Sequence, residues 1–212
     1  MKALGMIEVY SFSTAVAAAD AAAKAADVKI IAFDRNRPFA PTAPAPLIME
    51  IKMEGNVAAV NAGIEAAKMY AEKENKYIVS HVIANPDDST EKMAYLLDIN
   101  KDKFNKKLPK NTKDMASAPN PKESIGIIEI QGLVAAIEGL DKMLKTADVH
   151  LIHTEKRLGG RLVSIVVAGK VSAVSAAVES GVVAAAKLGK VYGKEIIARP
   201  HEEVTKYFDF ES

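Results

Sequence analysis

Few side chains in this sequence could carry acid–base or metal chemistry. The histidines are His81, His150, His153 and His201, and there is no cysteine. His150 and His153 stand three residues apart in a segment typical of a strand, so their side chains point to opposite faces and cannot form a close metal pair. The absence of cysteine excludes disulfides, thiolate metal sites and iron–sulfur ligation of the usual kind. We therefore predict neither a metal site nor a cofactor.

The carboxylates do not complete an obvious catalytic set with these histidines. His201 is followed directly by Glu202 and Glu203, while Glu8 and Glu129 occupy equivalent predicted strands. That equivalence favours a structural role for these two glutamates over a role as general bases. A Ser–His–Asp arrangement stays open, because residues distant in sequence can meet in space. We expect the chain not to be an enzyme.

Arginines gather in two predicted loops. The first loop, residues 35–46, begins with Arg35 and Arg37 and holds prolines at positions 38, 41, 44 and 46. These prolines exclude a helix or a central strand and favour polyproline II. The second loop, residues 156–161, holds Arg157 and Arg161 around a Gly-Gly turn. A phosphate-binding loop is a poor interpretation of this turn, because predicted strands flank it on both sides.

The composition is that of a soluble globular protein. Hydrophobic residues make up 49% of the chain and charged residues 26%, and the formal net charge of +1 gives no support for nucleic-acid binding. No uncharged apolar run approaches the ~20 residues of a membrane helix. The apolar run before Glu8 is too short for a signal peptide. We expect no nucleic-acid or membrane partner.

Hydrophobic periodicity predicts the order strand, helix, strand, strand, helix, strand, and predicts it twice. The expected strands span residues 5–9, 28–33, 47–53 and 77–84, and then 125–130, 149–155, 162–167 and 195–200. Two apolar stripes at helical spacing are expected to pack on the second sheet: Leu133, Ile137, Leu140, Leu144 and Ala147, and Val171, Val174, Val178, Val182 and Ala185. The second helix begins with almost no charge, which also suits burial against a neighbouring copy. The pattern predicts an α+β fold with helices on one face of each sheet.

The two halves are an internal repeat. Residues 5–34 align with 126–155, and residues 47–86 align with 161–200, with about a third of the positions identical. Matches that are not alanine include Gly5, Glu8, Asp20, Lys24, Asp27, Gly55 and Pro86. The proline-rich loop makes the first copy seven residues longer at this point. We expect a first domain at 1–97, a Lys/Pro/Asn-rich linker at 98–123 and a second domain at 124–212. A short helix is expected at 90–97, at the end of the first domain.

Several motifs of the second copy resemble bacterial microcompartment shell domains. They include the opening Ile125-Gly-Ile-Ile-Glu-Ile, the loop Glu155-Lys-Arg-Leu-Gly-Gly-Arg and the closing Ile197-Ala-Arg-Pro-His. The first copy resembles the same family through Leu4-Gly-Met-Ile-Glu-Val and His81-Val-Ile-Ala-Asn-Pro. The resemblance implies two tandem, unpermuted, ferredoxin-like βαββαβ domains, each with a four-stranded, mainly antiparallel sheet.

The resemblance also implies an assembly. Tandem members of the family form a homotrimer that mimics a hexagonal tile and meets other shell proteins, both hexamers and pentamers, at its edges. The resemblance places Lys24 and Lys145 at those edges. It also implies that Arg199 is the edge arginine of the second copy, and Asn85 stands at the corresponding position of the first copy. From the residues alone, both lysines are better explained as solvated helix residues.

The resemblance places the loop between the second and third strand of each copy at a central pore. The implied pore-lining residues are Arg35, Asn36, Arg37, Pro38 and Phe39 in the first copy, and Arg157, Leu158, Gly159, Gly160 and Arg161 in the second. A cationic lining, partly offset by Asp34 and Glu155, would favour small polar or anionic metabolites. Arginines that simply face bulk water are the alternative. The loop around Phe39 is a candidate gate, and a fixed constriction is equally compatible.

Two functions are therefore compatible with the sequence. The first is a structural, non-enzymatic component of a microcompartment shell in the bacterial cytoplasm. The second is a small-ligand-binding regulatory protein built from duplicated α+β domains. Assembly distinguishes them, because the first requires three chains in each particle.

Overall fold

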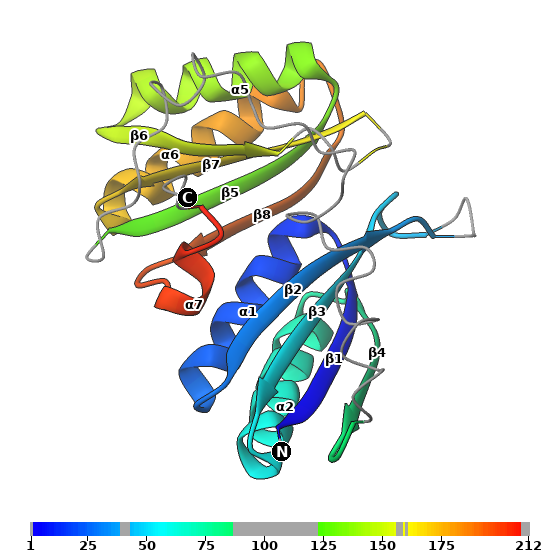
Figure 1. Cartoon of the computed structure of the whole chain (residues 1–212). Helices are drawn as coiled ribbons and strands as arrows, with labels where there is room; N and C mark the ends of the chain where they lie inside the picture. The colour runs from blue at the N-terminus through cyan, green and yellow to red at the C-terminus, as the bar shows by residue number, and fades with distance from the viewer. Residues whose placement is uncertain (1, 39–42, 87–122, 156–158, 160, 209–212) are drawn as a thin grey trace, which may run out of the picture. The chain divides into compact units, whose positions relative to one another are not determined.

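The computed structural model describes residues 2–38, 43–86, 123–155, 159 and 161–208 (Figure 1). The chain forms two compact units, Met1–Lys106 and Lys107–Ser212. The linker expected at 98–123 and the short helix expected at 90–97 fall almost wholly outside the described residues. No helix in the described ranges has the length and apolar character needed to cross a membrane.

The first unit is a four-stranded antiparallel sheet with two helices on one face (Figure 1). The strands lie in the order β2-β3-β1-β4. Its elements are β1 Ala3–Tyr10, α1 Phe12–Ala25, β2 Lys29–Asn36, β3 Ile48–Gly55, α2 Val57–Lys73 and β4 Tyr77–Ile83.

The second unit repeats this architecture with strand order β6-β7-β5-β8. Its elements are β5 Ser124–Gln131, α5 Leu133–Thr146, β6 Val149–Glu155, β7 Leu162–Gly169, α6 Val171–Ala185, β8 Val191–Ile197 and the short α7 Glu202–Thr205. The predicted α+β class and the βαββαβ order are confirmed in both units. The helix α7 was not expected from the sequence, and β8 begins four residues before the strand predicted at 195–200.

The sheets share details that only a duplicated fold would repeat. The register between β1 and β4 shifts between Glu8 and Val9, and the register between β5 and β8 shifts at the equivalent pair, Glu129 and Ile130. Glycine is required at positions 5 and 126 for the same reason in each unit. A Cβ on Gly5 would lie 2.6 Å from Val60, and one on Gly126 would lie 2.6 Å from Val178. Only glycine allows the second helix of each unit to lie this close to the central strand.

The predicted stripe on α5 packs on the core only through Leu140 and Ala147. Leu133, Ile137 and Leu144 are 56%, 59% and 43% exposed. The buried residues of α5 are instead Ala135, Ala136, Gly139 and Met143. Small residues allow α5 to lie close to α6, since a Cβ on Gly139 would lie 3.2 Å from the Cβ of Ala185. The stripe on α6 is buried at Val174, Val178 and Ala185, but Val171 is 49% exposed.

Candidate functional site

The first predicted pore loop begins later than the sequence suggested. Arg35 and Asn36 belong to the end of β2, where they pair with Met49 and Ile48 on β3. The strand β2 therefore continues through Arg35 and Asn36, and the loop begins at Arg37. The Arg37 backbone N–H donates to the Asn36 side-chain oxygen at 2.8 Å. Phe39 lies outside the described residues.

The second predicted loop closes with two residues in the left-handed region. Gly159 has φ 84° and Arg161 has φ 61°. The Leu162 N–H donates to the Gly159 carbonyl at 2.9 Å, and the Gly132 N–H donates to the Arg161 carbonyl at 2.9 Å. These bonds fix the end of the loop against the start of α5. The other candidates, Arg157, Leu158 and Gly160, lie outside the described residues.

A buried charge cluster supports the first loop and was missed in the sequence. Asp34, Glu50 and Glu8 lie directly opposite one another on β2, β3 and β1. Lys52 Nζ lies 2.5 Å from Asp34 Oδ2 and 3.6 Å from Glu50 Oε2. The Lys52 and Asp34 side chains are only 6% and 3% exposed. Glu50 and Lys52 alternate with apolar residues in the strand, a signal that could have placed them on one face.

The pKa of Glu50 is raised above its usual value. Burial is the main cause, and the nearby Asp34 and Glu8 carboxylates add to it, while Lys52 acts in the opposite direction. Burial therefore disfavours the charged form of Glu50 more strongly than Lys52 favours it.

The second unit has a histidine on the neighbouring strand where the first unit has Lys52. Lys52 lies opposite Ala32, whereas the equivalent pair is Val166 opposite His153. His153 Nε2 lies 3.9 Å from Glu155 Oε2, and the His153 ring lies 5.5 Å from the Phe208 ring. Glu155 occupies the place of Asp34 and is likewise buried. Asp34 and Glu155, near the ends of β2 and β6, are therefore both shielded from solvent.

The four candidate edge residues are exposed, but the two lysines differ. Lys24 Nζ lies 2.5 Å from Asp20, whose side chain is buried, and Lys145 Nζ lies 2.6 Å from the half-exposed Asp141. The hydrogen bond to Asp141 raises the pKa of Lys145. Asn85 and Arg199 follow the last strands, β4 and β8, of their units. The structure brings these residues into no shared site within either unit.

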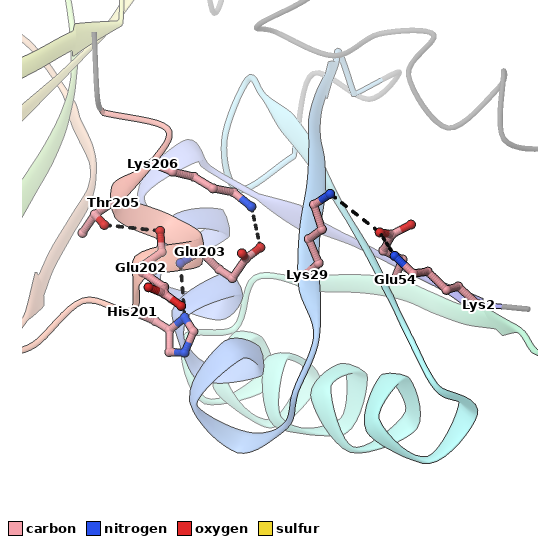
Figure 2. Close-up of polar contacts among 8 residues, drawn as sticks. All are labelled: Lys2, Lys29, Glu54, His201, Glu202, Glu203, Thr205 and Lys206. Carbon is pink, nitrogen blue, oxygen red and sulfur yellow. Dashed lines mark hydrogen bonds and ion pairs between the residues drawn. The ribbon is translucent and has the colours of Figure 1, made fainter. Parts of the chain in front are cut away.

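His201 has a structural task. Figure 2 shows its Nδ1 accepting a hydrogen bond from the Glu203 N–H at 3.2 Å, so His201 caps the start of α7. Lys206 donates to Glu203 at 2.5 Å in the same turn. Figure 2 also shows, within the first unit, Glu54 Oε1 bound to Lys2 at 2.6 Å and near Lys29 at 3.8 Å. Both sets are ordinary stabilising contacts.

Metal ligation finds no support in the part of the chain that the structure describes. There, no group of three or more histidines, aspartates and glutamates could hold an ion.

Comparison with known proteins agrees with this architecture. The profile described as "BMC domain" matches residues 3–86 and again residues 124–200. The chain belongs to the BMC-domain family of bacterial microcompartment shell proteins. Residues 3–86 and 124–200 are called the first and second BMC domain below.

Relatives of one and of two domains are found. "Bacterial microcompartment shell protein PduA" of Citrobacter freundii is 45% identical over 84 residues, which is 40% of this chain and 89% of PduA. "Bacterial microcompartment shell protein EutM" of Escherichia coli K12 is 41% identical over 86 residues, or 41% of this chain and 88% of EutM. "Carboxysome assembly protein CcmO" of Synechococcus elongatus is 30% identical over 202 residues, or 95% of this chain and 67% of CcmO. The last alignment spans both BMC domains.

The most prominent surface feature of the second BMC domain is the apolar side of α5. We define the α5 stripe as Leu133, Val134, Ile137 and Leu144. Val134 is the most exposed of them, at 73%. The stripe lies between the buried side of the helix and its charged side, which carries Glu138, Asp141, Lys142 and Lys145. Contiguous exposed apolar side chains of this kind mark an interaction surface.

The aligned positions of the first BMC domain carry different side chains. Phe12 on α1 aligns with Leu133. Ser13, Val16 and Ala23 align with Val134, Ile137 and Leu144, so three of these four positions are smaller or more polar on α1. The two BMC domains therefore present unlike surfaces on a common fold.

Proposed function

We propose that this chain is a structural tile of a bacterial microcompartment shell. Three chains close into a ring in which first and second BMC domains alternate, so that six similar wedges mimic a hexagon. The observation that carries the proposal is the α5 stripe, which leaves four large apolar side chains uncovered in the single chain. The proposed role is architectural rather than enzymatic.

The difference between α5 and α1 supports a ring rather than a two-fold dimer. A two-fold interface uses the same surface on both partners, whereas unlike surfaces make a head-to-tail contact that either closes into a ring or continues as a filament. The residues of the α5 stripe are not repeated on α1, so the stripe would contact a different surface of the neighbouring chain. With two domains per chain, three chains complete a six-fold pattern.

Flat edges would then join the tile to other shell proteins, hexamers and pentamers among them. Lys24 and Lys145 are the edge candidates on the helices, with Asn85 and Arg199 beyond the last strands. Their exposure supports this role. Because Lys24 is bound by a buried aspartate and Lys145 by an exposed one, alternate edges of the ring would offer their ammonium groups differently. The tile would lie in a shell within the cytoplasm.

The loops that follow β2 and β6 would line a central pore. Arg35, Arg37 and Arg161 are charged residues on or beside these loops, and Arg157 is a further candidate by sequence. Asp34 and Glu155 are buried, so they would offset this positive charge less than the sequence suggested. Such a pore would favour small polar or anionic metabolites.

Electron microscopy of the concentrated protein tests the tile. The proposal expects flat sheets or tubes with a hexagonal lattice. A stable monomer that forms no lattice and binds a small ligand tightly would favour a regulatory protein instead. The pore is tested separately by measuring ion preference in a reconstituted layer. Arg37→Ala and Arg161→Ala should reduce the preference for anions, and unchanged selectivity would contradict the cationic pore.

A further inference from the structure

A pocket of about 450 Å³ opens in the second BMC domain where β5 passes into α5. Pockets of this size accommodate small molecules. The wall comes from the β5–α5 junction, the start of β7 and the turn after α6. It consists of Gln131, Gly132, Leu133, Val134, Ala135, Arg161, Leu162, Val163 and Leu188. The wall is mostly apolar, and Arg161 is the charged residue in it.

The backbone holds Arg161 at this place. Its carbonyl accepts the hydrogen bond from the Gly132 N–H, and both residues have positive φ. A Cβ on Gly132 would lie 3.8 Å from Arg161 Nη2, so the guanidinium occupies the space beside the start of α5. Within the described part of the chain, the Arg161 side chain makes no hydrogen bond or ion pair. Its charge is therefore available to a ligand.

The first BMC domain provides an internal comparison. Ser11 has φ 80°, and its N–H donates to the Leu47 carbonyl at 3.1 Å, which reproduces the bond between Gly132 and Arg161. The side chains differ, however. Leu47 replaces the arginine and is fully buried, and the Ser11 and Ser13 hydroxyls hydrogen-bond to each other at 2.9 Å. The same backbone junction carries a cation only in the second BMC domain.

We propose that this pocket binds a small organic anion, in which a carboxylate pairs with Arg161 and a short apolar body contacts Leu188, which lies outside the α5 stripe. A guanidinium forms two parallel hydrogen bonds to a carboxylate, which gives both affinity and orientation. The apolar wall favours an organic anion over an inorganic one. Arg161 is also a candidate for the lining of the proposed pore. The statement that the pocket lies beside a metabolite passage therefore rests on the proposed function. Leu133 and Val134 belong to the α5 stripe, so the assembled protein is the form to test.

Fluorine NMR titration with two matched probes tests the charge requirement. 4-Fluorobenzoate and 4-fluorobenzamide have the same ring and similar size, but only the first is an anion. Wild-type protein should bind the benzoate at least about ten-fold more tightly, and added salt should reduce this difference because it screens the guanidinium. Equal binding of the two probes would overturn the proposal.

Variants assign the binding to Arg161. Arg161→Asn removes the charge and keeps a residue that tolerates positive φ, so it should weaken benzoate binding about ten-fold and leave the benzamide unchanged. Arg161→Lys should retain most of the binding. Leu188→Asp, at a side chain 59% exposed, should weaken the benzoate more than the benzamide without disturbing folding. Lys73→Asn removes one charge from the first BMC domain and is the matched control.

The same samples separate this proposal from the ring. Light scattering gives the number of chains per particle independently of the probes. A three-chain particle in which Arg161→Asn binds benzoate as wild type does would overturn the pocket and leave the ring intact. A single chain with charge-dependent binding would overturn the ring and leave the pocket intact.

Discussion

Substitution of Ile137 tests whether the α5 stripe is the contact between chains. Ile137 lies in the middle of the stripe, and 59% of it is exposed in the single chain. Ile137→Ala removes most of this apolar surface, and Ile137→Glu replaces it with a charge. Since the side chain makes little contribution to the core of its own domain, neither change should unfold the chain.

The size of the effect follows from the exposed fraction. Complete burial of an isoleucine side chain contributes about 1.5–3 kcal/mol, so covering the exposed part of Ile137 contributes roughly 1–2 kcal/mol for each interface. Three identical interfaces make this about 3–5 kcal/mol for the ring. At 1.4 kcal/mol for each factor of ten, Ile137→Ala should lower the ring association constant by roughly a hundred- to several thousand-fold. Ile137→Glu would bury an unpaired carboxylate at every interface and should prevent assembly.

A dilution series in the analytical ultracentrifuge measures the association directly. Lys142→Ala is the matched control, because Lys142 is exposed on the same helix but lies outside the stripe. Circular dichroism checks that each variant keeps the wild-type fold. If Ile137→Glu formed particles of wild-type mass with unchanged dissociation, the α5 stripe would not be the interface and the reasoning would fail.

Two further predictions concern the buried charges of the first BMC domain. Lys52→Met should reduce the free energy of unfolding by about 3–5 kcal/mol in chemical denaturation, because it leaves Asp34 buried without the Lys52 ammonium. Lys29→Met, at an exposed ion pair, is the control and should change the free energy of unfolding by less than about 1 kcal/mol. Equal effects of the two substitutions would contradict the argument. Burial raises the pKa of Glu50, so the folded chain keeps this proton where the unfolded chain has released it, and the contribution of Glu50 to stability falls as pH rises above 4.5. The stability of Glu50→Gln should therefore decline less than that of wild type from pH 4.5 upward, and parallel pH profiles would refute the assignment.

The sequence predicted elements well where one local signal dominates. The expected strand 149–155 coincides with β6. At the start of α2, Asn56 accepts a hydrogen bond from the Ala59 N–H, as asparagine commonly does at this position of a helix. The repeat also predicted the second sheet from the first.

The α5 stripe shows where periodicity is insufficient. The spacing of Leu133, Ile137 and Leu144 identifies residues on one side of a helix, but it does not say what that side contacts. The packing side is selected by close approach, since a Cβ on Gly181 of α6 would lie 2.4 Å from Met143. Glycines in both helices were the available signal. In the proposed tile, the apolar side that remains exposed is the contact between chains.

The buried charge cluster was hidden for a different reason. Alternation predicts which residues of β3 share a face, but not whether that face is open to water. Lys52 was not singled out from the sequence, whereas in the structure it lies against Asp34 on the neighbouring strand and Glu50 on its own strand. The loop residues Arg35 and Asn36 were misplaced because the prolines that end the strand begin only at Pro38.

Native mass spectrometry of the wild-type chain is the most direct test of the proposed tile. The account predicts a particle of three times the chain mass of 22.7 kDa, reduced to single chains by Ile137→Glu. A wild-type particle of 22.7 kDa at micromolar concentration, or one whose mass is unaffected by Ile137→Glu, would contradict it.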